Sequence, residues 1–243
     1  MLLSVDDWND LAVAAATACW AIGVLIVLIY FIRLISIRES KDRYDFINRY
    51  EIRWLWIGSV LIISGGCFFG NSAVLEISFI WAIIRILVTL LLGTIVALVT
   101  QHLLKFYYPF YIEKRLKRLR YKPRMSPSGR PMRLLSEQEE DAYMDEGMLA
   151  EENIFSMDYD VWKDEESGFV SIEKYAGHLH ALKCPECGCQ TMKVSGEKVV
   201  KPPRDYDDGL LEKSYLCGYC QHSMSKTVRL RFISKLDAVT QSA

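Results

Sequence analysis

Residues 11–32 read LAVAAATACWAIGVLIVLIYFI and contain no charged side chain. A run of 22 such residues can cross the roughly 30 Å hydrocarbon core of a bilayer as a helix. Acidic residues precede the run and Arg33 follows it, which is not the charge order of a cleavable signal peptide. We therefore predict a transmembrane helix over 11–32.

Two further apolar runs, 54–75 and 77–104, are also long enough to span. We predict an α-helical membrane domain over 1–104 with three transmembrane helices at about 11–32, 54–75 and 77–104. Arg85 lies inside the third run, and we expect its side chain to reach the outer headgroups. A pairing inside a helix bundle is the alternative.

Small residues recur four apart in each run, a spacing that favours close packing among these helices or a dimer. The pairs are Ala14 with Ala18, Gly66 with Gly70, and Gly93 with Ala97.

The basic residues that flank the runs predict the orientation, because lysine and arginine near spanning helices stay in the cytoplasm. Fourteen of them lie after the first and third runs. They are Arg33, Arg38, Lys41, Arg43, Arg49 and Arg53 in the first loop, then Lys105, Lys114, Arg115, Lys117, Arg118, Arg120, Lys122 and Arg124. We therefore expect a multi-pass inner (plasma) membrane protein with its N-terminus outside and its C-terminal half in the cytosol.

Residues 105–124 form a basic juxtamembrane segment in which aromatic residues precede the cations. Pro109 is expected to end or kink the membrane helix. The cations predict contact with anionic membrane lipid, and RNA or an acidic protein is the alternative ligand of this segment. The net charge of −1 for the whole chain does not favour nucleic acid as a partner.

Residues 136–166 reverse this charge, with thirteen acidic residues and one basic residue. Large apolar residues are interspersed among them, which is not typical of a disordered acidic tail. We predict an amphipathic helix or helix pair here, with Ser136 and Glu139 spaced as a capping box.

Four cysteines predict a metal site. Cys184 and Cys187 form one C-x-x-C pair, Cys217 and Cys220 form another, and 29 residues separate them. In a reducing compartment such pairs hold metal more often than they form a disulfide. Four thiolates suit structural Zn²⁺, and a long hairpin that turns near Pro202 and Gly209 would join the two pairs.

Alternatives to this ligand set remain. Cys189 and His222 each lie two residues beyond a pair and could substitute as ligands, whereas His178 and His180 are expected on the surface. Iron is the second choice of metal, because CPECG resembles a rubredoxin knuckle that holds iron for electron transfer.

Residues 120–188 also resemble the cytosolic tail of TPM-domain membrane proteins, with a looser continuation to Cys220. The matching features are Pro123 and Arg124, Gly129 and Met132, residues 139–141 with Tyr143, Gly147, Glu151 and Glu152, Ser156, and residues 158–162. The resemblance implies two successive zinc ribbons. The extracytoplasmic TPM domain is not expected, because about ten residues precede the first span.

The first implied ribbon lacks its cysteines, since Met125, Ser128, Asp164 and Ser167 occupy those positions. PSGRPMR from Pro127 nevertheless echoes ECGCQTMK from Glu186, as two copies of one turn would. We therefore predict a small α+β cytosolic domain of zinc-ribbon type. It comprises a degenerate metal-free ribbon with an acidic helical insert at 125–175, a zinc ribbon at 176–235 and a tail at 236–243.

The chain has no serine, histidine and carboxylate set and no phosphate-binding glycine loop. We expect no enzymatic activity and no small-molecule substrate. The favoured function is an accessory or assembly subunit whose ribbon domain docks a protein partner in a membrane complex, or a second copy of the chain. A channel or transporter subunit regulated by the ribbon, and a rubredoxin-like electron carrier, are the alternatives.

Overall fold

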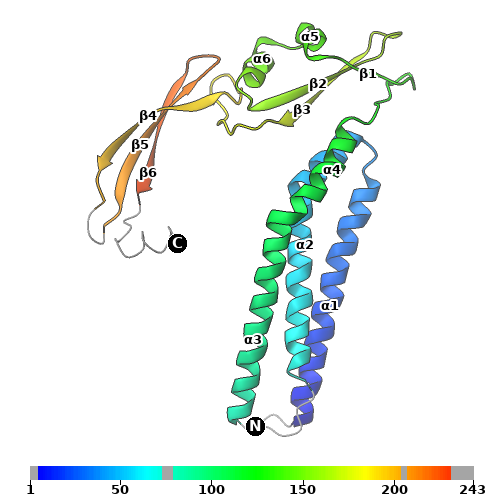
Figure 1. Cartoon of the computed structure of the whole chain (residues 1–243), viewed down its shortest axis with the longest axis vertical. Coiled ribbons are helices and arrows are strands. Elements are labelled where there is room, and N and C mark those ends of the chain that lie inside the picture. The colour runs from blue at the N-terminus through cyan, green and yellow to red at the C-terminus, as the bar shows by residue number, and fades with distance from the viewer. Residues whose placement is uncertain (1–4, 73–78, 204–206, 231–243) are drawn as a thin grey trace. The chain divides into compact units, whose positions relative to one another are not determined.

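The computed structural model describes residues 5–72, 79–203 and 207–230. The chain divides into two compact units, Met1–Lys122 and Pro123–Ala243. The first unit is helical, and the second contains two small sheets and short helices (Figure 1).

The first unit is an antiparallel arrangement of long helices (Figure 1). They are α1 (Val5–Ser36), α2 (Ser40–Gly70) and α3 (Phe79–His102), which continues through one π-helical turn, Leu103–Tyr107, into α4 (Tyr108–Arg120). Three segments, Val5–Ser36, Ser40–Gly70 and Ile80–Arg120, are long and apolar enough to cross a membrane. The predicted runs lie within these longer helical segments, except that Asn71 and Ser72 follow the end of α2 and that residues 73–75 and 77–78 lie outside the described residues.

Two features differ from the expected loops. The basic segment after the first run is helical from Ser40 onwards, because Tyr44, Ile47 and Glu51 recur at helical spacing and face the neighbouring helices. Pro109 was predicted to end or kink the third helix. It does not end the helical segment, but the regular α-helix is interrupted by the π-helical turn directly before it. Pro109 lies in the first turn of α4, where its missing N–H is tolerated.

Helices α1 and α2 approach closely through small residues. Gly23 faces Gly58, and a Cβ added to Gly58 would lie 2.7 Å from a methyl group of Val27. A Cβ added to Gly65 would lie 2.5 Å from the ring of Trp20. Gly93 of α3 faces Cys67 in the same way.

Two of the predicted small-residue pairs are not these contacts. Ala14 and Ala18 are exposed, whereas Ala12 and Ala16 are buried. Gly66 has open space where Gly65 has Trp20. The buried alanines keep the four-residue spacing but lie two residues earlier, and the packed glycine lies one residue earlier. Each residue turns a side chain by about 100° around a helix, so the predicted register was wrong.

A buried carboxylate joins three helices of this unit. Glu51 of α2 is 1% exposed and accepts hydrogen bonds from Tyr30 of α1 and, at 2.6 Å, from the hydroxyl of Tyr108. Arg115 of α4 completes the cluster as its ion-pair partner. Since a buried carboxylate needs such partners, Glu51 fixes how α4 lies against α1 and α2.

Arg85 lies at the opposite end of the helices. Its Nε and Nη2 donate to the carbonyl of Gly70 at 3.0 and 2.8 Å, and Nη2 donates to that of Ser72 at 2.6 Å. The guanidinium therefore caps the C-terminus of α2, where a cation is stabilised by the helix dipole.

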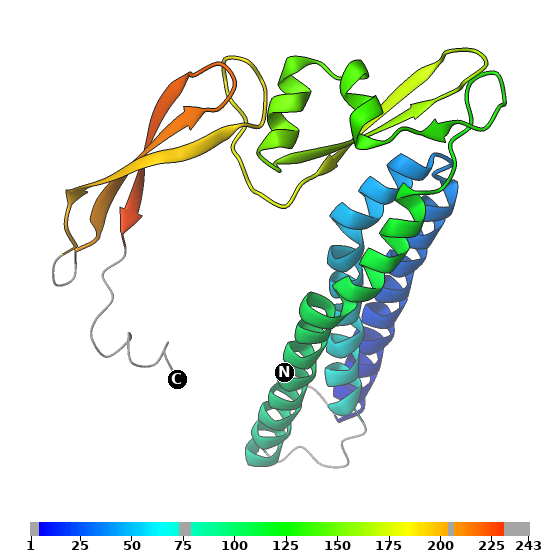
Figure 2. The same cartoon turned by 45° about the horizontal axis from the view of Figure 1, so that its top comes forward.

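The second unit begins with a three-stranded antiparallel sheet of order β1-β2-β3. Its strands are β1 (Arg133–Leu134), β2 (Met157–Lys163) and β3 (Val170–Ala176). The predicted acidic helix pair is α5 (Glu137–Glu140) and α6 (Glu146–Asn153), inserted between β1 and β2 (Figure 2). The capping box is confirmed, with the Ser136 amide donating to Glu139 at 3.0 Å.

The insert covers a small apolar core. Leu135, Met144, Tyr159 and Val161 form it, with Met148 and Leu149 of α6 packed against it. Trp162 is also buried, and the guanidinium carbon of Arg124 lies 4.9 Å from its ring centroid.

The second sheet has the order β4-β5-β6. It consists of β4 (Met192–Lys201), β5 (Gly209–Cys217) and β6 (Ser223–Leu230), all antiparallel. The long hairpin expected between the cysteine pairs is thus confirmed as β4–β5, although 204–206 of its turn lie outside the described residues.

Gly65 and Gly66 offer a matched test of the α1–α2 contact. We expect Gly65→Val to destabilise the helical unit by about 1–3 kcal/mol, because its side chain must displace Trp20. Gly66→Val adds the same residue where nothing lies within 4 Å and should leave stability unchanged. Thermal unfolding of the full chain in mild detergent measures both. Equal losses in the two variants would contradict this packing.

Candidate metal centre

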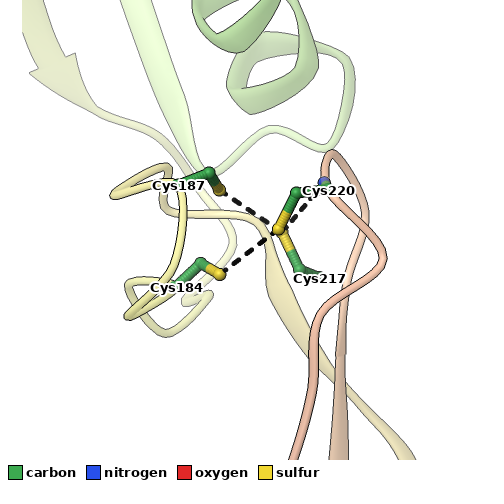
Figure 3. A group of neighbouring side chains, drawn as sticks. All are labelled: Cys184, Cys187, Cys217 and Cys220. Atoms are coloured by element: carbon green, nitrogen blue, oxygen red, sulfur yellow. Dashed lines mark hydrogen bonds between the residues drawn. The ribbon is translucent and has the colours of Figure 1, made fainter.

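Four cysteines from two turns converge in the second unit. Cys184 and Cys187 lie in the turn before β4, and Cys217 and Cys220 lie at the turn that joins β5 to β6. Figure 3 shows the four side chains pointing toward one another. The antiparallel register brings them together, since Met192 at the start of β4 pairs with Cys217 at the end of β5.

The sulfur positions fit a tetrahedral metal site. Cys184 Sγ lies 3.6 Å from Cys220 Sγ, and Cys187 Sγ lies 3.7 Å from Cys217 Sγ. All four sulfur atoms lie within 4.8 Å of one another. Metal–sulfur bonds of about 2.3 Å in a tetrahedron give sulfur–sulfur edges of about 3.8 Å. The four cysteines could therefore hold a metal ion.

Neighbouring donors favour the thiolate form of Cys217. Burial alone would raise the pKa of this thiol. The Thr191 hydroxyl, 3.0 Å from its sulfur, and the Cys220 amide, at 3.4 Å, outweigh that effect and lower the pKa to about 6. The backbone hydrogen bonds of Cys187 and Cys220 are outweighed by burial and the neighbouring thiols, which raise the pKa of both. The preference for the thiolate, which is the metal-binding form, therefore belongs to Cys217 and not to the whole cluster.

The alternative ligands lie outside this cluster. Cys189 directs its sulfur toward the carbonyl of Cys187, 3.9 Å away, and toward Gly147 of α6. The carbonyl of His222 accepts from the Cys217 amide and so shapes the second turn. Within the described residues, neither side chain joins the four-sulfur cluster, nor do His178 and His180.

The first sheet carries the same two turns without cysteines. The amide of Asp164 donates to the carbonyl of Phe169, as that of Cys217 donates to His222, both at 2.9 Å. Gly168 and Gln221, each four residues into the turn, have φ values of 72° and 60°. Asp164 and Ser167 therefore occupy the positions of Cys217 and Cys220, as predicted.

The other turn is one residue shorter than predicted. Gly129 and Gly188 have similar positive φ values, 79° and 76°. The Gly129 amide donates to the carbonyl of Ser126, and the Gly188 amide donates to that of Cys184. Ser126, not Met125, is thus the counterpart of Cys184. Met125 is 63% exposed. Ser126 and Ser128 are two residues apart, whereas Cys184 and Cys187 are three apart. The cysteine spacing therefore predicted Met125 in place of Ser126.

Hydrogen bonds join these two turns of the first sheet at the positions where the cysteine sulfur atoms meet in the second sheet. Ser128 Oγ lies 2.7 Å from Ser126 Oγ and donates to Asp164 Oδ2 at 3.1 Å, and Ser167 Oγ donates to the same oxygen at 2.5 Å. Asp164 is 2% exposed, and the Ser167 hydroxyl holds the pKa of its carboxyl well below its usual range. An ionised carboxylate with hydroxyl donors therefore lies between the two turns of the first sheet.

Glu151 of α6 connects the first sheet with the first cysteine turn. Its carboxylate accepts from Tyr159 and Lys174 of the first sheet, and from the Gln190 amide at 2.6 Å. Burial would raise the pKa of Glu151, but these donors outweigh it and lower the pKa. Because Gln190 follows the first cysteine pair, Glu151 fixes that turn against α6.

A group of carboxylates also lies on the helical insert. Oxygens of Glu137, Glu140 and Glu152 lie within 4.8 Å of one another. Burial, followed by repulsion from Glu137 and Glu152, raises the pKa of Glu140 to about 7. Glu140 therefore binds a proton in part of the molecules at neutral pH.

No known family model, curated protein or solved structure matches this chain. The resemblance to TPM-domain tails therefore stays a prediction, and the function has to be argued from the geometry above.

Replacing Glu151 tests the connection between α6 and the cysteine turns. We expect Glu151→Ala to destabilise the second unit by about 3–5 kcal/mol, because it leaves Lys174, Tyr159 and the Gln190 amide without their shared acceptor. Glu146→Ala removes a carboxylate of the same helix whose contact, to the Tyr219 hydroxyl, is 3.5 Å long and exposed. Its expected effect is below about 0.5 kcal/mol.

Hydrogen exchange of the full-length protein measures the two variants, with the Tyr159 and Gln190 amides as reporters. The account requires faster exchange at both amides in Glu151→Ala alone. Unchanged protection at Gln190 would show that Glu151 does not hold the cysteine turn.

Proposed function

We propose that the chain is a three-span protein of the inner (plasma) membrane whose C-terminal unit is a cytosolic zinc-ribbon docking module. In this proposal it serves as an accessory or assembly subunit of a membrane complex. The observation that carries it is the tetrahedral arrangement of Cys184, Cys187, Cys217 and Cys220. Four thiolates close the coordination shell of Zn²⁺ and leave no position for water or substrate, which supports a structural ion.

The helices support the membrane assignment. Three segments have the length and apolar character of spans. Apolar side chains such as Leu25, Leu87 and Leu91 are more than half exposed along them, and a hydrocarbon environment would cover these surfaces. The basic residues gather around α4 and the start of α2, which supports a cytosolic location for the unit that follows.

The second sheet supports a docking role. Every residue of β4 after Met192 is exposed. Register places Val199, Leu211 and Val228 in one row across the three strands. Val199 and Val228 are 53% and 36% exposed. An uncovered apolar row on a metal-stabilised sheet suits contact with a protein partner.

Leu216 provides a control for this row, because it is 39% exposed and points to the opposite face of β5 from Leu211. We expect Val228→Ser to weaken partner binding about tenfold and Leu216→Ser to leave it within about twofold. The test purifies each full-length variant from its native membrane in mild detergent at low salt. Mass spectrometry then identifies and quantifies the proteins recovered in stoichiometric amount.

The metal content of both variants is measured as a control, because a variant that loses its metal could lose the partner for that reason alone. Selective loss of one stoichiometric partner from Val228→Ser supports docking through this face. Recovery of a solitary chain from wild-type membranes would contradict the accessory-subunit proposal.

A further inference from the structure

A cationic cavity lies in the helical unit, between the end of α1, the start of α2 and α4. Its volume is about 490 Å³. The lining residues are Leu34, Ile35, Arg43, Ile47, Arg115, Arg118, Leu119 and Lys122. Four of these eight side chains are cationic and none is acidic. The cavity therefore has the charge of an anion-binding site.

Two of its arginines carry buried donors without acceptors. Arg43 donates through Nη2 to the carbonyl of Ile37 at 2.6 Å, and Arg115 donates through Nη2 to Glu51. The Nε atoms of both are buried and have no hydrogen-bond partner among the described residues. A buried donor left unsatisfied costs about 1–3 kcal/mol. Because both side chains line the cavity, an anion bound there would offset part of this cost through its attraction to the two guanidinium groups.

Arg118 adds a cation that no described residue neutralises. It is exposed on α4, and the described part of the chain gives it no ion pair. Guanidinium groups bind phosphate oxygens through paired N–H donors. The donor set thus favours a phosphate group over a smaller anion.

The apolar residues that line the rest of the cavity indicate which kind of molecule carries the phosphate group. Leu34, Ile35, Ile47 and Leu119 make half of the lining. Ile35 is 75% exposed, and it continues a strip of α1 that includes Phe31 and Ile32, 44% and 62% exposed. An apolar strip that leads into a cationic cavity fits an acyl chain joined to an anionic headgroup.

We propose that this cavity binds the phosphate group of an anionic phospholipid, with Arg43, Arg115 and Arg118 as donors and the α1 strip along an acyl chain. The inference rests on the proposed membrane location of the helices. It adds a specific lipid site to that proposal.

Arg118 and Lys117 allow a matched test. Arg118→Gln removes a lining cation without breaking the Glu51 cluster, and Lys117→Gln removes the preceding cation of α4, which does not line the cavity. Native mass spectrometry of the full-length protein in detergent measures the binding of three probes: phosphatidylglycerol, phosphatidylcholine and inorganic phosphate.

We expect one equivalent of phosphatidylglycerol to bind at least about tenfold more tightly than phosphatidylcholine. Arg118→Gln should weaken that binding about fivefold, and Lys117→Gln should leave it within about twofold. Equal binding of the two lipids, or equal effects of the two substitutions, would overturn the site. Inorganic phosphate that displaces phosphatidylglycerol at equal concentration would overturn the lipid as its source.

Carbonate extraction of native membranes separates this inference from the proposed function. A chain that resists extraction but lacks selective lipid binding refutes the cavity proposal alone. A chain released by carbonate refutes the membrane location on which both rest.

Discussion

The convergence of two turns that lie 29 residues apart in the sequence organises the second sheet. Its core consists of Cys184, Met192 and Cys217, with few other apolar groups packed against them. Most of β4 and much of β6 are exposed, so apolar burial contributes little to this sheet. In the proposed function, metal–thiolate bonds would supply the missing folding free energy directly.

The first sheet also brings two turns together, but it joins them with different chemistry. Its two turns repeat the backbone hydrogen bonds of the cysteine turns, yet Asp164 and three serine hydroxyls replace the sulfur atoms. Hydrogen bonds of this kind contribute about 1–3 kcal/mol each, far less than a structural metal. The difference is offset by the apolar core around Tyr159 and Val161, which the helical insert covers. The first sheet thus relies on apolar packing, and Glu151 holds the cysteine turn before the second sheet through the Gln190 amide.

Sequence patterns predicted the features that depend on local spacing. Apolar run length located the three long helices, and the C-x-x-C pairs located the four convergent cysteines. The features that were missed depend on register or on contacts between distant segments. Glu51 lies in a basic segment, four residues after Ile47 and seven before Gly58, and all three are buried on one face of α2. This helical spacing was the available signal for the burial of Glu51. The shift from Met125 to Ser126 and the contact of Glu151 with Gln190 require the folded turns to be known.

We propose that a metal ion holds one pair of turns and that hydrogen bonds hold the equivalent pair. Metal content of the purified full-length protein, determined by elemental analysis with its visible absorption spectrum, tests it most directly. The account predicts one zinc per chain and no colour, with loss of that zinc in Cys217→Ser. A red iron–thiolate spectrum, two bound metals per chain, or folded protein that contains no metal would contradict it.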